Sequence, residues 1–484
     1  MKTILPRTLD WIAGFLLLGL CLFGGPLSRL NNHVGSFLRE IAAVFEDPST
    51  QWMVVLCALA YFACFAFLRL RSPVAARRLW ATPAFWLSAF TAIAAISFFV
   101  SAVRGRSATA ALMLVTGAAL GQGVALWNAS TRRRTGLTIL TIPGILVLLL
   151  MLATLFNSDS LFQFHYRGML RSTGAWDNPN TFGNLMAVGL VLAAGQCFRL
   201  GMSVVRSSRQ ASGLTGISRQ RGAMLIPWVQ AAFFAAASVL FARGLLGSYS
   251  RGAWLGAALA FSYLAWNWFT GPSSATQTPS PSNTNVAGVP PALSPLGPPL
   301  RPPSRPRLRA FLLPAAVILG CIFVFAFWTF RHADTRTARR VFSVANPNDF
   351  SWKNRLAAYE GALQMIAARP WLGYGWNQPE PLYGAFYKPP QVTEGMAIQL
   401  NDYFTLGMAI GLPALACFLV SIGLAFGASR ETSRHAAQHS AASPHHSQRI
   451  ICRAAVIVLL VGFWFDGGLF KLPTAAPFWI LLDS

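Results

Sequence analysis

Charged residues are scarce in this sequence, and acidic residues are the scarcest. Only 11% of the 484 residues are charged, with 15 Asp and Glu against 39 Lys and Arg. A soluble domain usually carries about 25% charged residues, so the composition excludes an ordinary soluble protein. Hydrophobic residues make up 54% of the chain, and several apolar runs reach about 20 residues, enough to cross the hydrocarbon core as a helix. The sequence predicts an all-α integral membrane protein.

Hydropathy predicts about twelve transmembrane helices, of which the last two are the shortest. The predicted spans cover residues 11–28, 52–68, 81–103, 109–127, 136–156, 181–198, 223–242, 249–269, 310–330, 403–427, 454–465 and 468–482. Between them the sequence leaves two segments that are too long to be simple connections. The chain divides into membrane helices 1–269, a linker 270–309, a span 310–330, an outer loop 331–402 and C-terminal membrane helices 403–484.

The net charge of +24 follows from membrane topology and does not indicate nucleic-acid binding. With a cytoplasmic N-terminus, the predicted outer loop 29–51 carries Glu40, Glu46 and Asp47, whereas the inner loops carry arginines. These are Arg69, Arg71, Arg77, Arg78, Arg132, Arg133, Arg134, Arg199, Arg206, Arg209, Arg219, Arg221, Arg301, Arg305, Arg307 and Arg309. Short inner loops rich in Arg and Lys match the positive-inside rule. The pattern predicts a multi-pass protein with both termini in the cytoplasm and membrane lipid around it.

Cysteines are few, and their positions argue against a disulfide framework. They are Cys21, Cys57, Cys64, Cys197, Cys321, Cys417 and Cys452. All lie in predicted spans or at the edge of an inner loop, which faces a reducing compartment. We therefore expect packing roles for most of them.

The two long segments outside the spans differ in character. Residues 270–309 are rich in Pro, Ser and Thr, and they cannot bury enough apolar surface to offset ordering entropy, so we expect a disordered cytoplasmic linker. Residues 331–402 contain the run SWKNRLAAYEGALQMIAARP, which predicts a helix over Ser351–Pro370. Its expected apolar face consists of Leu356, Tyr359, Leu363 and Ile366. A long loop with ordered pieces is usually functional.

The positive-inside rule does not explain the basic residues of the predicted outer loop. Arg340 and Arg355 lie in it, against the inside bias, which long loops escape because they translocate largely regardless of charge. Arg251, in GSYSRGAWLG, begins a predicted span near the same outer interface. It is interpreted either as a snorkelling interface anchor or as an anion clamp, since a guanidinium matches phosphate oxygens with a bidentate fork.

A second outer-face motif is RGMLRSTGAWDNPNTFGNLM. Asn178 and Asn180 flank Pro179 in a strong turn signal, and Asn180 or Thr181 is expected to cap the next helix. The alternative is that Arg171 and the amides bind sugar hydroxyls or phosphate at the membrane surface.

Taken in order, the segments TGAWDNPNTFGN, SYSRGAWLG, NRLAAYEGALQMIAARPWLGYGW and LNDYFTLGMAIGLPA resemble the O-antigen ligase and polymerase family. Members are bacterial inner-membrane glycosyltransferases with a large periplasmic loop. The resemblance implies transfer of a glycan from an undecaprenyl-diphosphate carrier to an acceptor hydroxyl on a lipid or glycan. It implies no metal or cofactor, because arginines take that role in the family.

The resemblance also assigns residues. Arg251 with Leu255 matches the family's Arg-x-x-x-Leu element, and Arg355 matches the essential arginine of the large loop. Both would hold the carrier diphosphate and stabilise the charge that grows on it. Arg171 and Arg340 are weaker candidates for the same task. The residues expected to position substrate are Asn178, Asn180 and Asn401.

One position departs from the family pattern. Asn401, Gly411 and Ala414 keep the expected spacing, but the family's histidine, proposed there as the general base, is Leu400 here. Three accounts remain open. A carboxylate half-buried at the membrane edge, Asp402 or Glu394, acts as the base with a raised pKa; a histidine elsewhere on the outer face, His165 or His332, enters the site; or the protein binds a lipid-linked glycan without transferring it.

Two further classes of function stay open beside the glycosyltransferase. A transporter or flippase for a lipid-linked glycan would favour broken helices and ionisable residues at mid-membrane, whereas here these residues cluster at span ends. A non-catalytic membrane scaffold is the other.

Overall fold

The computed structural model describes Leu22 and residues 83–100, 141–155, 164–166, 169–174, 176, 178–211, 217–270, 350–375, 379–390, 401–439 and 444–483. The predicted spans 52–68, 109–127 and 310–330 lie outside the described residues, as do all of span 11–28 except Leu22, nearly all of the linker and the candidates Arg340, Glu394 and Leu400.

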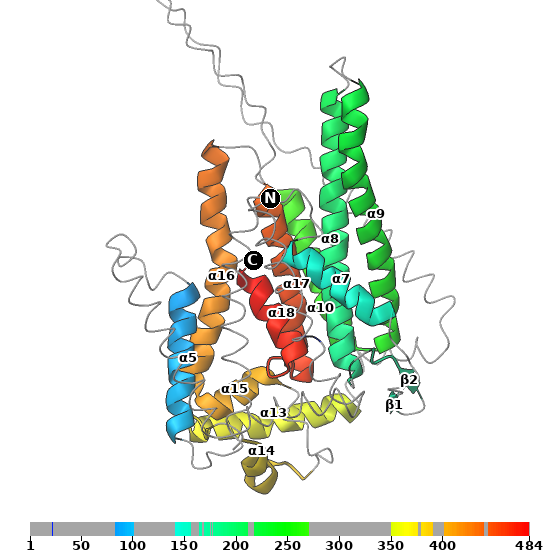
Figure 1. Ribbon diagram of the computed structural model, residues 1–484. Coiled ribbons are helices and arrows are strands. Elements are labelled where there is room, and N and C mark those ends of the chain that lie inside the picture. Colours follow the sequence, from blue (N-terminus) through cyan, green and yellow to red (C-terminus); the bar gives the residue numbers. More distant parts are fainter. Residues whose placement is uncertain are drawn as a thin grey trace, which may run out of the picture.

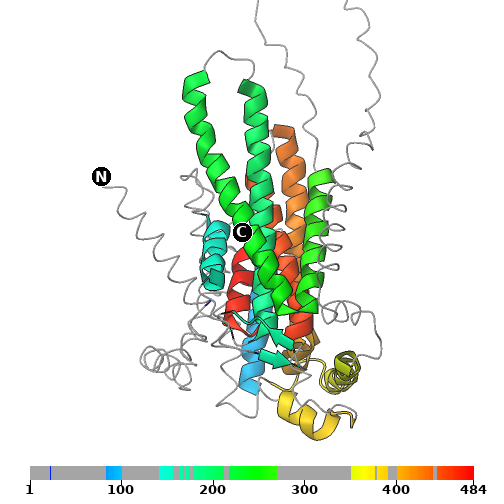
Figure 2. The same cartoon turned by 90° about the vertical axis from the view of Figure 1, so that its right-hand side faces the viewer.

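The described core is a bundle of long helices that run side by side (Figures 1 and 2). They are α8 (Pro179–Ala211), α9 (Ile217–Ser248), α10 (Arg251–Thr270), α16 (Leu412–His439) and α17 (Pro444–Asp466). Three segments of the described chain are long and apolar enough to cross a membrane by length and composition: Pro179–Val204, Leu225–Ser248 and Ser447–Phe465. Helices α8 and α9 form an antiparallel pair, and α17 packs against both α8 and α10.

Shorter elements complete the bundle. They are α5 (Pro83–Val100), α7 (Ile142–Leu155) and α18 (Leu472–Asp483). A small antiparallel hairpin of β1 (Phe164–Tyr166) and β2 (Met169–Arg171) pairs Phe164 with Arg171. The expected helical class is confirmed, and this hairpin is the one addition to it among the described residues.

The structure corrects the C-terminal spans. The single span expected over 403–427 is two helices, α15 (Asp402–Ile410) and α16, because the chain turns at Gly411 with φ 85° and ψ 169°. Such backbone angles are essentially restricted to glycine. The span expected over 454–465 is part of α17 and begins ten residues earlier, at Pro444. Hydropathy is averaged over a window of many residues, so it detects neither the turn at Gly411 nor the start of α17.

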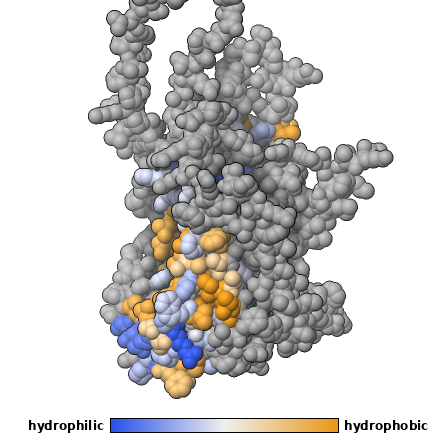
Figure 3. Space-filling model, turned by 90° about the vertical axis from the view of Figure 1, so that its left-hand side faces the viewer, coloured by the Kyte–Doolittle hydropathy of each residue, from blue (hydrophilic) through white to orange (hydrophobic). Residues whose placement is uncertain are grey.

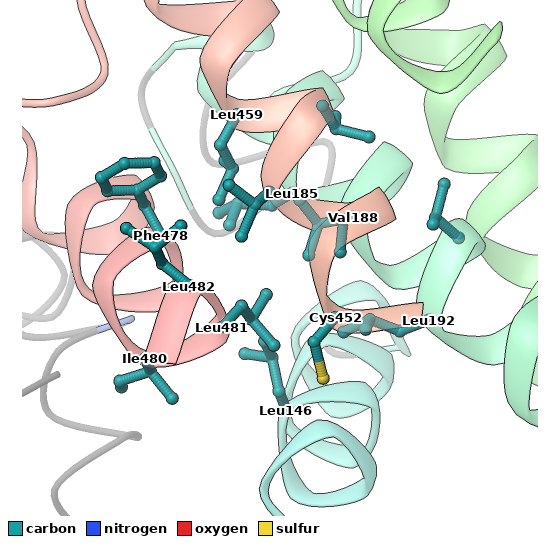
Figure 4. Close-up of a cluster of buried hydrophobic side chains, with 14 of the residues drawn as sticks. Leu146, Leu185, Val188, Leu192, Cys452, Leu459, Phe478, Ile480, Leu481 and Leu482 are labelled. Atoms are coloured by element: carbon teal, nitrogen blue, oxygen red, sulfur yellow. The ribbon is translucent and has the colours of Figure 1, made fainter. Parts of the chain in front are cut away.

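A dense apolar core joins α7, α8, α17 and α18 (Figure 4). Leu146 from α7, Leu185 from α8 and Leu459 from α17 are each fully buried. Phe478 of α18 lies 5.1 Å from Phe463 of α17, ring centroid to centroid. The short α18 is therefore held by side-chain packing at one end of α17, and this fixes the turn between the two helices.

The outer-loop elements form a layer across one end of the bundle, the lower end in Figure 1. They are α13 (Phe350–Ala368), α14 (Pro379–Leu382) and the π-helical turn Tyr383–Tyr387, with α15 above them. A second small core holds this layer together. It consists of Ala358, Ala362, Met365, Ile366, Tyr383 and Met408.

The helix predicted over Ser351–Pro370 is confirmed as α13, but its buried face is only in part the expected one: Ile366 is buried as expected. Leu356 and Leu363 are about half exposed, at 50% and 55%. The buried stripe starts at Ala358 and Ala362 instead, since small side chains allow the neighbouring π-helical turn to approach closely. At Gly361 a Cβ atom would collide with the Tyr387 carbonyl oxygen.

The surface over α5 and α16 is suited to lipid. Figure 3 shows hydrophobic side chains over the middle of the described surface on this side and hydrophilic ones gathered near its lower end. Exposed apolar residues there include Ile96 of α5 and Leu419 of α16. On this side the hydrophilic residues at the lower end therefore lie next to an apolar surface.

Candidate functional site

The C-terminal end of α17 contacts Arg355 and the residue that follows Arg251. Arg355 Nη2 donates a hydrogen bond to the Phe465 carbonyl oxygen at 3.1 Å, and its guanidinium lies 5.5 Å from the centroid of the Phe465 ring. The first turn of α10 packs against the same residue, since a Cβ at Gly252 would lie 3.0 Å from the Phe465 Cβ. Gly252 follows Arg251 directly, so the fold brings both arginines to one end of α17.

The start of α10 has an electrostatic preference for anions. Arg251 is the first residue of the helix, and the first turn contains no acidic residue. A helix N-terminus carries a partial positive charge and unpaired N–H groups, so a cation there is unfavourable unless an anion is near. Tyr249, two residues before Arg251, has φ 51°, an uncommon conformation for a residue with a side chain. The turn between α9 and α10 therefore presents two sources of positive potential at one place.

Arg171 supports this turn from the side. Its Nε donates to the Ser248 carbonyl at 2.8 Å, and its Nη2 donates to Asn180 Oδ1 at 2.7 Å. The Arg171 side chain is buried. It thus ties the β hairpin to the α9–α10 turn and to the first turn of α8. Its expected contact with diphosphate stays a prediction.

The cap of α8 differs from the expected one. The helix begins at Pro179, and Asn178 caps it: Asn178 Oδ1 accepts from the Asn180 N–H at 2.8 Å, while the Asn178 carbonyl accepts from the Phe182 N–H at 3.1 Å. Proline is well suited to the first helical position because its missing N–H would lack a partner there. The prediction of Asn180 or Thr181 as the cap is wrong by two or three residues.

Asn401 and Asp402 anchor α15. Asn401 Oδ1 accepts from the N–H groups of Tyr403 and Phe404 at 3.0 and 3.2 Å, as an N-cap. Asp402 Oδ2 accepts from the Leu469 N–H at 2.6 Å, in the turn between α17 and α18. Asp402 is only 1% exposed, so the expectation of a half-buried carboxylate is wrong. Its carboxylate holds α15 against the end of α17.

An aromatic cluster, which sequence reasoning missed, joins the same elements. Tyr359 of α13 lies 4.9 Å from Phe404 and 5.9 Å from Trp464 between ring centroids. Tyr403 lies 5.8 Å from Trp464 and donates its hydroxyl to the Leu460 carbonyl at 2.8 Å. The only sequence signal for the cluster was that Tyr359 is one helical turn after Arg355, on the same side of the helix.

The segment WLGYG (residues 371–375) pairs with the C-terminal end of α15 through its backbone. Tyr374 N–H donates to the Met408 carbonyl at 2.8 Å, and Gly375 N–H donates to the Ala409 carbonyl at 2.9 Å. These contacts satisfy carbonyl groups at the end of α15, which a helix leaves unpaired. Trp371 is 75% exposed beside them, where an indole suits a membrane interface.

The described candidates therefore lie along one chain of contacts. Arg171 and Asn180 contact each other at the α9–α10 turn, Arg251 follows this turn, and Arg355 lies at the end of α17. Asn401 and Asp402 join through the α17–α18 turn, which begins next to Phe465. Within the described ranges no group of three or more His, Cys, Asp or Glu is placed to hold a metal ion.

Three segments of the described chain are long and apolar enough to cross a bilayer, and Arg355 of α13 lies at one end of the helix bundle. These features define a helical membrane protein with a candidate site at this end of the bundle. The particular family follows from sequence comparison: residues 236–419 match the O-antigen ligase family. The match contains Arg251, Arg355, Asn401 and Gly411, so the predicted resemblance is confirmed. This part of the chain is similar to the O-antigen ligase domain. Among curated proteins, none matches the chain.

Proposed function

We propose that this protein transfers a glycan from an undecaprenyl-diphosphate carrier to an acceptor hydroxyl, with inversion, at the periplasmic face of the bacterial inner membrane. The observation that carries the proposal is that Arg355 contacts Phe465, while Gly252, the residue next to Arg251, packs against the same Phe465. Two guanidinium groups beside a helix N-terminus suit a diphosphate, because all three favour negative charge. The end of the bundle that holds α13 would face the periplasm, with both chain termini in the cytoplasm.

The reaction would exchange one bond for another at the anomeric carbon. The acceptor oxygen forms a bond to this carbon, and the bond from the carbon to the diphosphate oxygen breaks. The electron pair stays on the diphosphate, which leaves with the carrier lipid, and the acceptor proton passes to a base. Arg251 and Arg355 would stabilise the growing charge, with Arg171 and Arg340 in support, while Asn178, Asn180 and Asn401 would orient the sugar and the backbone around it.

The function itself is tested by reconstitution. We expect the full chain in liposomes to convert an undecaprenyl-diphosphate-linked oligosaccharide and a lipid or glycan acceptor into the joined product, with release of undecaprenyl diphosphate. Electrophoresis of labelled glycan separates a ligase product from a polymer. Binding of the carrier without any joined product would contradict transfer and support a non-catalytic binder. Movement of the carrier across the bilayer without product would support a flippase.

The base is tested at Asp402 and Glu394. We expect either Asp402→Asn or Glu394→Gln to lower the transfer rate about 10²- to 10⁴-fold, the usual contribution of a general base. The Asp402→Asn variant keeps an oxygen that can accept from the Leu469 N–H, so its thermal unfolding temperature should change little. Unchanged transfer in both variants would exclude the carboxylate account. The Leu400→His variant, which restores the family's residue, is the comparison for a gain in rate.

A further inference from the structure

Beside Arg355, the side chains of Tyr359 and Asn401 each bury a polar group that has no regular hydrogen-bond partner among the described residues. The Tyr359 hydroxyl and Asn401 Nδ2 are both buried, and neither makes a hydrogen bond of regular geometry within the described part of the chain. Asn401 itself is 1% exposed. Buried polar groups in native proteins nearly always have partners, so each exception needs an explanation.

The orientation of the Asn401 amide is fixed. Its Oδ1 accepts two N–H groups as the cap of α15, so exchanging the oxygen and nitrogen would lose both bonds. Nδ2 is therefore a donor whose direction is set by the fold. Even if the Tyr359 hydroxyl accepted from it, the hydroxyl hydrogen would still need an acceptor. The two side chains together therefore still need a hydrogen-bond acceptor.

The hydroxyl is also a donor for electrostatic reasons. Burial raises the pKa of Tyr359, while the neighbouring Asn401 amide and the Arg355 cation lower it, with burial the largest effect. A phenol with a raised pKa stays protonated at neutral pH and acts as a donor, so Tyr359 does not replace the missing histidine as a base. Its position is held by the Phe404 and Trp464 rings, which limits its movement.

We propose that the Tyr359 hydroxyl and the Asn401 amide donate hydrogen bonds to the anion that Arg355 binds, and that this anion is the diphosphate of the lipid-linked glycan. The inference rests on the proposed function and adds Tyr359 to the residues that touch the substrate. Arg355 and Tyr359 are one turn apart on α13, so both face the end of α17. Hydrogen bonds from neutral donors to the leaving oxygen become stronger as negative charge develops on it.

The test is Tyr359→Phe, which removes only the hydroxyl. We expect kcat for transfer to fall about ten- to a hundredfold, the range for a hydrogen bond to a charged group. The thermal unfolding temperature should be unchanged or slightly higher, because the deleted hydroxyl has no regular partner in the protein. Lower activity without lower stability separates a substrate contact from a structural one.

Tyr383→Phe is the matched control. The Tyr383 hydroxyl is likewise buried without a hydrogen-bond partner, but it belongs to the small core of the outer loop. Its pKa is raised by burial alone, without Arg355 or Asn401 beside it. We expect this variant to match Tyr359→Phe in stability and the wild type in kcat.

The outcomes distinguish this inference from the function on which it rests. If Tyr359→Phe retains wild-type kcat while Arg355→Ala loses transfer, the inference is overturned and the proposed function stands. If both variants keep wild-type transfer, the proposed function is overturned as well. If Tyr359→Phe loses activity together with a matching fall in unfolding temperature, the role is structural and the inference is also overturned.

Discussion

Replacement of Arg355 by alanine is expected to lower glycan transfer about 10²- to 10³-fold, the usual loss when one group that stabilises developing negative charge is removed. The expected loss follows from the position of Arg355 at the end of α17. Arg355 lies on the outer-loop helix α13 and reaches the end of α17, where the first turn of α10 brings Arg251. A cation at the edge of the bilayer acts in a lower dielectric than water, so its loss is poorly compensated by solvent.

The same arginine also supports the fold, and the experiment has to separate the two effects. Its Nη2 bond to the Phe465 carbonyl helps to hold α13 on the bundle. Arg355→Lys keeps the charge and loses the planar fork, so we expect transfer between that of the wild type and that of the alanine variant. Lys353→Ala removes an exposed cation two residues away on α13, and it should leave transfer and stability near the wild type.

The double variant Arg251→Ala with Arg355→Ala tests whether the two arginines act on one group. Residues that act as a unit are strongly non-additive. We therefore expect the double variant to lose less than the product of the two single losses. Full transfer by Arg355→Ala in the reconstituted system would rule out the diphosphate assignment for this residue.

Replacement of Gly411 by alanine should remove most of the folded protein. Gly411 has φ 85° and ψ 169°, a region that residues with a Cβ enter only at a cost of about 1–3 kcal/mol. The added Cβ would also collide with the Trp371 carbonyl oxygen. Relief would require the WLGYG segment to move, with loss of its backbone bonds to the end of α15. Because Asn401 and Asp402 begin α15, the candidate site would be disrupted too.

The control for this prediction is Gly423→Ala, in the same region of the chain. Gly423 lies inside α16, and apart from the backbone of its own helix no atom lies within 4 Å of its Cβ position. Alanine favours a helix over glycine by about 1 kcal/mol. We expect it to be neutral or slightly stabilising. Thermal unfolding in detergent and the yield of monodisperse protein on size-exclusion chromatography measure both variants. A Gly411→Ala protein as stable as the wild type would contradict the tight turn at this position.

Composition and hydropathy were sufficient for the class of protein and for most described helices. Long apolar runs can satisfy backbone groups in lipid only as helices, so α10 lies close to its predicted bounds, and α8 and α9 contain their predicted spans and extend beyond them. The order and spacing of short motifs also predicted the family. The distance from Asn401 to Gly411 now has a structural meaning, because the nine residues between form α15 from its cap to its terminal turn.

What the sequence alone determined is therefore a helical membrane protein that resembles the O-antigen ligase family over residues 236–419, while the anion-binding roles of Arg251 and Arg355 stay predictions. Only the tertiary structure decided the break at Gly411, the buried face of α13, the structural contacts of Arg171 and Asp402, and the unsatisfied donors of Tyr359 and Asn401. The physical reason is the sequence separation of the residues that interact. Hydropathy and helical periodicity are local properties, whereas a glycine's backbone angles, a helix's buried face and a polar group's partners depend on segments that are distant in sequence and meet only in the fold.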